Sequence, residues 1–264
     1  MHHTVVDGIR IAYDDLGARD AQGPAFLLLP GWCTDRTVFA PLAERLATFG
    51  RTLVMDWAGH GDSERPVRDF GAADLLAQAR GVMADSGVEQ VIPITVSHAG
   101  WVALELRRAL GERVAGLVFL DWIVSPAPPP FSAILTQMQS PDWRAAVEQI
   151  FGMWLHGVDN ERVIRFVREG MGAYPGTMWA RAGREISASY LTHGNPLSAA
   201  SQLNVRAIHL YGQPDDPGYL AYQQEFAAQH AFFQVKKLAT RSHFPTLECP
   251  DVLVDAIRAW LANP

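Results

Sequence analysis

Short runs of apolar residues alternate along this chain with longer stretches in which apolar residues recur every three or four positions. The short runs have the length of β-strands, and the longer stretches have the period of helices that bury one face. Strands that are apolar throughout are typical of a sheet covered by helices on both faces. The alternation of the two patterns therefore predicts an α/β fold with a mostly parallel sheet.

Eight strands and four core helices follow from this pattern. The first two strands form a hairpin around Asp7-Gly8, a dipeptide that favours tight turns between strands. The expected strands cover residues 4–6, 9–13, 25–29, 52–55, 90–96, 117–120, 206–211 and 233–238. The expected helices cover residues 38–47, 72–85, 101–110 and 251–261.

The stretch 125–201 interrupts this alternation. It opens with the proline-rich run 126–130, which cannot lie inside a sheet, and continues as short helical patterns rich in Trp, Met and Phe. Two interpretations remain open, namely extra packing helices or a lid over a pocket. We favour a helical cap at 125–201, inserted after the strand that ends at Asp121, with residues 1–124 and 202–264 forming the core.

Composition narrows the class of protein. The 264 residues are 48% hydrophobic, which is enough for a sizeable core, and the net charge is −6. An acidic chain without a block of Lys or Arg is a poor partner for nucleic acid or anionic membranes. The start lacks the pattern of a secretory leader, no apolar run is long enough to span a bilayer, and Cys33 and Cys249 form no disulfide framework. We expect a cytoplasmic protein that is a monomer or homodimer.

Ser97 lies where an apolar strand changes directly into a helical pattern. This strand–turn–helix context is that of a nucleophile elbow, in which small residues flank a strained serine. Thr95 and Ala99 stand where glycines are usual, and Thr95 is the bulkier departure. The alternative is a serine that only caps the helix.

Leu29-Pro30-Gly31-Trp32-Cys33 forms another turn between a strand and a helix. In a fold with this elbow, that loop supplies one backbone N–H to an oxyanion hole, and the residue after the serine supplies the other. These donors would be Trp32 and His98. The tight turn Gly59-His60-Gly61-Asp62-Ser63 is expected to have a structural role, with His60 as a turn residue.

His243 follows the last strand, where such a fold places its general base, and the order Ser, Asp, His fits. The acid that orients it has two candidates. Asp121 ends the strand after the elbow helix, and Asp215 follows the next strand, which is the commoner hydrolase position. Asp beside Pro is also a loop signal, which offers a plain alternative for Asp215 and Asp216. Periodicity leaves the choice open.

No spacing typical of a metal site, a dinucleotide fold or a phosphate-binding loop occurs, so we expect no metal and no cofactor.

Several of these segments together resemble one family, the cofactor-independent 2,4-dioxygenases of 3-hydroxy-4(1H)-quinolones, which have the α/β-hydrolase fold. The similarity extends over nearly the whole chain and is strongest to enzymes that degrade 2-alkyl-3-hydroxy-4(1H)-quinolones, including the 2-heptyl signal PQS. The matching segments are Leu29–Cys33, Val96–Val102, Leu120–Trp122, Met153–Leu155 and Ser242–Pro245, with Trp179 in the cap.

This resemblance implies an eight-stranded sheet with a small helical cap, and a reaction in which O2 and the quinolone give carbon monoxide and an N-acylanthranilate. It implies that His243 and Asp121 are catalytic. The substrate-binding residues implied are Ser97, Trp32, His98, Trp154, Ile123 and Trp179.

One departure concerns the pocket. The 2-methylquinolone members of the family carry histidines where this chain has Thr34 and Val96, and the more apolar pocket suits a longer alkyl tail. Two other functions remain as alternatives. One is a serine hydrolase of an ester, lactone or amide with Ser97 as nucleophile, and the other is a non-catalytic receptor on the same scaffold.

Overall fold

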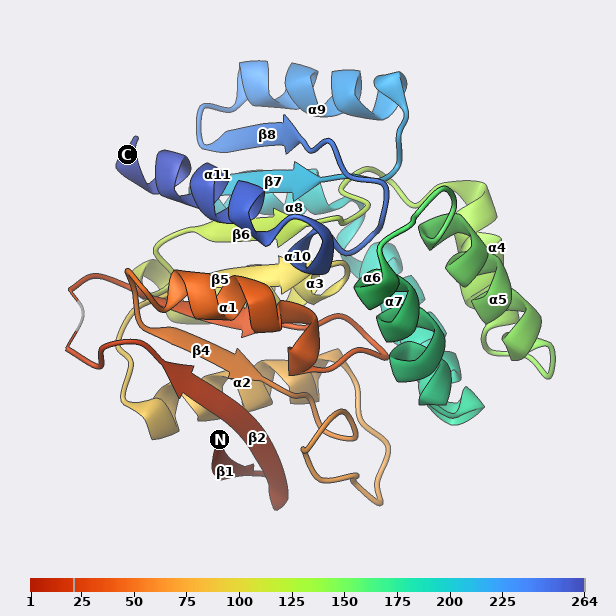
Figure 1. Cartoon of the computed structure of the whole chain (residues 1–264), viewed down its shortest axis with the longest axis horizontal. Coiled ribbons are helices and arrows are strands. Elements are labelled where there is room, and N and C mark those ends of the chain that lie inside the picture. Colours follow the sequence, from red (N-terminus) through yellow and green to blue (C-terminus); the bar gives the residue numbers. More distant parts are fainter. Residues whose placement is uncertain (21, 264) are drawn as a thin grey trace.

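One sheet of eight strands organises the molecule (Figure 1). The computed structural model describes residues 1–20 and 22–263. The strand order is β1-β2-β4-β3-β5-β6-β7-β8, in which β1 and β2 pair antiparallel, β2 pairs antiparallel with β4, and the other pairs are parallel. The strands are β1 His2–Val6, β2 Ile9–Leu16, β3 Ala25–Leu29, β4 Thr52–Met55, β5 Val91–Val96, β6 Leu117–Leu120, β7 Ala207–Tyr211 and β8 Phe233–Lys237.

The apolar runs became strands because helices cover both faces of the sheet. Every residue of β3, β4, β5, β6 and β7 is buried. In Figure 1, α1 (Ala40–Leu46) and α11 (Pro250–Ala262) lie in front of the sheet, and α2 (Ala72–Ser86) and α3 (Ala99–Leu110) lie behind it. This arrangement confirms the predicted α/β-hydrolase fold and its mostly parallel eight-stranded sheet.

One core helix is not predicted by the pattern. Helix α9, Pro217–Gln229, packs beside β8 but buries few side chains, among them Tyr219 and Gln223, so it has no apolar stripe. Its start depends on Asp216, whose side chain accepts the backbone N–H of Gly218 at 2.8 Å, followed by a proline in the first helical position. Such a pair marks a helix N-terminus as well as a turn.

Between β6 and β7 the chain forms a group of helices, of which α4 to α7 lie beyond the carboxyl ends of the strands and α8 lies behind the sheet (Figure 1). Helices α4 and α5 pack against α7, whereas α8 packs mainly against α3. The elements are α4 Pro129–Gln137, α5 Trp143–Trp154, α6 Glu161–Arg165, the short helices η3 Phe166–Gly170 and η4 Met171–Ala173, α7 Gly176–His193 and α8 Pro196–Leu203. Two short 3₁₀ helices, η1 Arg36–Phe39 and η2 Gly111–Arg113, and the four-residue helix α10, Pro245–Glu248, complete the described elements. None of the helices in the described ranges has the length and apolar character needed to cross a bilayer.

Candidate active site

Ser97 occupies a strained turn between β5 and α3. Its φ of 54° lies in the left-handed region that non-glycine residues rarely adopt. The backbone N–H of Ser97 donates to Leu120 O at 2.9 Å, which ties the elbow to the end of β6. Gly100 makes room for this arrangement, because a Cβ there would lie 2.3 Å from the ring of Trp122. The elbow geometry is thus supported by the neighbouring strand that carries Asp121.

Asp121 and His243 face each other across the ends of β6 and β8. The Asp121 carboxylate is buried, and its Oδ1 lies 3.8 Å from His243 Nδ1. That separation is longer than a hydrogen bond. The carboxylate is held by two backbone N–H groups of the loop after β7, from Gly212 at 3.0 Å and Gln213 at 2.8 Å. Asp121 therefore has a fixed position from which it can orient the base.

The alternative acid lies elsewhere. The Asp215 side chain is 94% exposed and pairs with Lys237 Nζ at 3.4 Å. Of the two candidate carboxylates, Asp121 is thus the one that faces His243.

The two backbone donors expected for an oxyanion hole lie on segments that are in contact. A Cβ on Gly31 would lie 3.3 Å from Val96 O and 3.6 Å from Ser97 Cβ, so the loop with Trp32 passes beside the elbow with His98. Cys33, the next residue of the loop, also has a positive φ, of 55°. The backbone there is strained and needs support from its surroundings.

The His98 side chain is held by three aromatic neighbours. Its Nδ1 accepts the indole N–H of Trp122 at 3.2 Å, and its ring stacks on Phe131 of α4 with centroids 5.4 Å apart. The ring of Tyr190 meets it edge to face at 5.8 Å. Because indole can only donate, neutral His98 carries its proton on Nε2. Desolvation, with a smaller effect from the charge on His243, lowers the pKa of His98 to about 3.

Trp154, the last residue of α5, stacks on His243. Its ring is nearly parallel to that of His243, at 6° and 4.6 Å between centroids, and only 12% of the His243 side chain is exposed. Trp154 therefore shields one face of the His243 ring from solvent.

Trp179 and Ile123 lie further out. Trp179 is buried on α7 and meets Phe151 edge to face at 5.7 Å, and Phe151 in turn lies 6.2 Å from Trp154. The Trp179 indole N–H has no hydrogen-bond partner in the described part of the chain. Ile123 is half-buried, and its carbonyl accepts the Tyr190 hydroxyl at 2.5 Å.

The structure adds residues that the motifs do not indicate. His209, buried in β7, accepts the backbone N–H of Trp122 on Nε2 at 3.2 Å, and its Nδ1 lies 2.5 Å from Gln223 Oε1. The Tyr219 hydroxyl donates to Trp122 O at 2.6 Å. Burial lowers the pKa of His209 to about 4, so it is neutral near pH 7. A histidine inside the apolar run Ala207–Tyr211 is the sequence signal that marks this support.

Other reactive groups are poorly placed for chemistry. Burial raises the pKa of the Cys33 thiol and that of Cys249, the latter to about 12, so neither is an ionised nucleophile at neutral pH. Within residues 1–20 and 22–263, no group of three or more His, Cys, Asp or Glu side chains is arranged to hold a metal ion.

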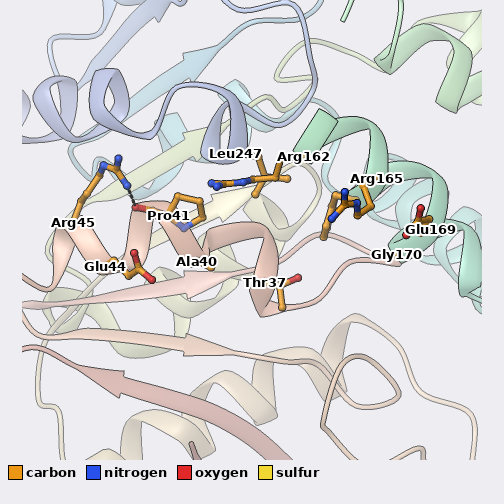
Figure 2. Close-up of a pocket in the computed structure, with 11 residues that line it drawn as sticks. Thr37, Ala40, Pro41, Glu44, Arg45, Arg162, Arg165, Glu169, Gly170 and Leu247 are labelled. Carbon is orange, nitrogen blue, oxygen red and sulfur yellow. Dashed lines mark hydrogen bonds between the residues drawn. The ribbon is translucent and has the colours of Figure 1, made fainter. Parts of the chain in front are cut away.

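A groove of about 620 Å³ lies between α1, α10 (Pro245–Glu248) and the α6–η3 segment (Figure 2). Arg45, Arg162 and Arg165 line it together with Pro41 and Leu247, and none of the predicted site residues does. One of its lining residues, Phe166, meets Phe244, the residue after His243, edge to face at 5.3 Å.

Comparison with known proteins identifies relatives. Residues 26–256 match the model of the alpha/beta hydrolase family. A 2-heptyl-3-hydroxy-4(1H)-quinolone dioxygenase of Mycobacteroides abscessus is 36% identical over 96% of this chain and 95% of its own length. A 1H-3-hydroxy-4-oxoquinoline 2,4-dioxygenase of Pseudomonas putida is 31% identical over 99% of each chain.

Solved structures agree with the sequence matches. A variant of AqdC in complex with its substrate, solved to explain recognition and ring cleavage of the Pseudomonas quinolone signal, superposes with a TM-score of 0.94. It is 34% identical, and the match covers 100% of this chain and 99% of that one. The predicted resemblance to quinolone dioxygenases is therefore confirmed.

Proposed function

Because the chain belongs to the 3-hydroxy-4-quinolone dioxygenases of the α/β-hydrolase family, we propose that it cleaves 2-alkyl-3-hydroxy-4(1H)-quinolones with O2. The 2-heptyl compound is the proposed substrate, and an N-acylanthranilate and carbon monoxide are the products. The observation that carries this proposal is the near full-length match to relatives named for this reaction. The His243–Asp121 pair supplies the base that such a reaction requires.

The first step is removal of the 3-hydroxyl proton by His243. Asp121 orients the imidazole and stabilises its charge, and Trp154 adds the attraction of its ring face. The neutral state of His98 matters here, since a second cation beside His243 would oppose the proton transfer. Asp121 and Trp154 thus favour the imidazolium that forms when the substrate loses its proton.

The substrate anion then supplies the electrons. Dioxygen chemistry commonly uses a metal or a flavin, whereas here the electron-rich anion passes one electron to O2. The two radicals combine at C2, and the resulting peroxide closes on C4. The ring opens with loss of C3 as carbon monoxide, and both oxygen atoms of O2 remain in the N-acylanthranilate.

Backbone N–H groups of Trp32 and His98 would bind the negative 4-oxygen, and one such donor contributes about 3 kcal/mol in enzymes generally. Ser97 would hydrogen-bond the substrate and not attack it. We propose that residues 125–201 act as a cap, with Trp154, Trp179 and Ile123 excluding water from the anion and the peroxide.

The loop after β3 supports an alkyl-substituted substrate. The Thr34 hydroxyl donates to Gly31 O at 2.9 Å, so this polar group is already satisfied within its own loop. Val96 is buried and apolar. A site with these two residues is suited to a longer apolar tail.

The decisive experiment is anaerobic mixing of purified, metal-free enzyme with 2-heptyl-3-hydroxy-4(1H)-quinolone, followed by admission of air. We expect ultraviolet absorbance to show the bound anion before air, then its consumption with release of carbon monoxide. An absence of turnover in air would contradict the proposal for this substrate, and the 2-methyl analogue would be tested next.

The strained geometry of Ser97 supports a second candidate, hydrolysis of an ester, lactone or amide. Covalent labelling by a fluorophosphonate, together with ester turnover that Ser97→Ala abolishes, would establish it. The dioxygenase proposal expects Ser97→Ala to keep most of its quinolone turnover.

A further inference from the structure

The loop that carries Trp32 lies against the tight turn after the neighbouring strand β4. Three hydrogen bonds join them: the Trp57 indole N–H donates to Pro30 O at 2.6 Å, the Cys33 N–H to His60 Nε2 at 3.1 Å, and the Arg36 N–H to Asp56 Oδ1 at 2.6 Å. Packing holds the three partner side chains of the turn in place, since Asp56, Trp57 and His60 are at most 1% exposed. The turn therefore provides a rigid surface that determines the path of residues 30–36.

His60 makes the bond nearest the proposed donor. Its Nε2 accepts from the residue directly after Trp32, and its ring also meets that of Trp32 at 5.9 Å. The other ring nitrogen, Nδ1, lies 3.0 Å from Ala58 O, which can only accept, so Nδ1 carries the proton and Nε2 has a free lone pair. Burial lowers the pKa of His60 to about 4, which keeps this arrangement at neutral pH.

The bond acts where the loop is strained. Cys33 has a φ of 55°. Burial raises the pKa of its thiol, so the side chain is uncharged and does not hold this backbone in place by electrostatic attraction. Strained backbone persists only where its surroundings determine it. The ring of Tyr174, from the segment between η4 and α7, covers His60 at 5.0 Å, so solvent does not compete for the bond.

We propose that His60 is a positioning residue that aims the backbone N–H of Trp32 at the negative oxygen of the substrate. It acts through Cys33, without touching the substrate. The proposal rests on the proposed function, and it gives the turn after β4 a role in the reaction beyond the structural one.

Two substitutions of His60 distinguish the roles of its two ring nitrogens. His60→Gln places an amide oxygen near the position of Nε2 and can still accept from Cys33, whereas His60→Asn places an amide nitrogen near Nδ1 and loses the acceptor. We expect His60→Asn to lower kcat by about 10-fold to 100-fold, approaching the loss of one oxyanion donor. His60→Gln should stay within a few-fold of the parent enzyme.

A second measurement reports on the donor itself. In anaerobic titrations, absorbance gives the pH at which bound 2-heptyl-3-hydroxy-4(1H)-quinolone ionises. We expect this midpoint to rise in His60→Asn and to stay near the parent value in His60→Gln. His230→Asn is the matched control, since His230 caps α9 far along the chain and bonds only locally, with Nδ1 2.9 Å from Phe226 O.

The outcomes are distinct. The proposal would be overturned if kcat fell equally in His60→Asn and His60→Gln. It would also be overturned if both variants had lower melting temperatures but kept the kcat and the substrate ionisation midpoint of the parent enzyme. If His60→Asn does not fold, Trp57→Phe, which removes the bond to Pro30, should show the same direction of change, and parental kcat there would count against it. A parent enzyme that does not turn over the quinolone would instead refute the proposed function.

Discussion

The two halves of the candidate site are built by different forces. On the core side, hydrogen bonds hold the loop after β3, the elbow and Asp121, with donor–acceptor distances of 2.6–3.2 Å to their neighbours. On the side of the proposed cap, the contacts that lead to His243 are between rings, from Trp179 through Phe151 and Trp154. Hydrogen bonds fix direction, whereas ring packing fixes shape and excludes water.

This difference predicts how each half responds to mutation. Core changes should alter the chemistry and leave substrate affinity nearly intact, because they act on charge that develops during the reaction. Changes in the proposed cap should alter binding and rate together, since the proposed function places the same rings beside the substrate and His243. Measurements of kcat and KM on variants of each half, compared with matched controls, can test this difference.

The largest effect is expected for His243→Ala. Removing a general base typically costs about 100-fold to 10,000-fold in rate, and we expect kcat to fall within that range. Anaerobic absorbance should show that bound substrate no longer becomes an anion near neutral pH. Rapid anion formation in this variant would show that another group is the base.

Asp121→Ala should have a smaller effect on the same step. Loss of a carboxylate that orients a functional histidine costs on the order of 10-fold to 100-fold, and KM should change little. The matched control is Asp215→Ala, whose carboxylate is solvent-exposed. An Asp215→Ala variant that is as impaired as Asp121→Ala would contradict the assignment of the acid.

Trp154→Leu tests the cap. Loss of the ring stacked on His243 removes about 1 kcal/mol of cation stabilisation, which corresponds to roughly a fivefold lower kcat, and KM should rise as well. Trp154→Phe should retain most activity because it keeps a ring face. Trp143→Leu, at the other end of α5, serves as control, and an equal effect there would indicate only helix destabilisation.

The last prediction concerns the stability of the core and expects the smallest change in catalytic rate. His209 has a pKa of about 4 in the folded protein and near 6.5 when unfolded, so the unfolded chain binds more protons between these values. The free energy of unfolding should therefore fall as pH drops from 6.5 to 4, by up to about 3 kcal/mol from this residue. Denaturant titrations of His209→Gln should give a flatter pH dependence, and an unchanged slope would refute this contribution.

The same difference between the two halves of the candidate site explains which features the sequence could predict. The buried strands and the turns that follow them are local features, so Ser97, Asp121 and His243 could be placed at the ends of β5, β6 and β8 from the pattern alone. The choice between Asp121 and Asp215 could not, because it depends on how the loops after β6 and β7 meet.

The contacts of the proposed cap could not be predicted from the sequence. That Phe131 stacks on His98 and Trp154 on His243 depends on how α4 and α5 pack over the core, and no periodicity records that packing. The support that His209 and Gln223 give to the backbone of Trp122 could not be predicted either, since both are polar residues buried by partners distant in sequence. Helix α9 was missed because its burial is slight and its start resembles a turn.

The position of the Asp121 carboxylate has an evolutionary consequence. Although Asp121 follows β6, its two oxygens meet the backbone amides of Gly212 and Gln213 in the loop after β7, where hydrolases more commonly carry their acid. The two donors belong to the backbone, so they hold the carboxylate through the path of this loop and not through the identity of its side chains. In this chain the constraint on inheritance therefore falls on the path of the loop, and most strongly on Gly212, because a Cβ there would lie 2.1 Å from Thr240 Oγ1.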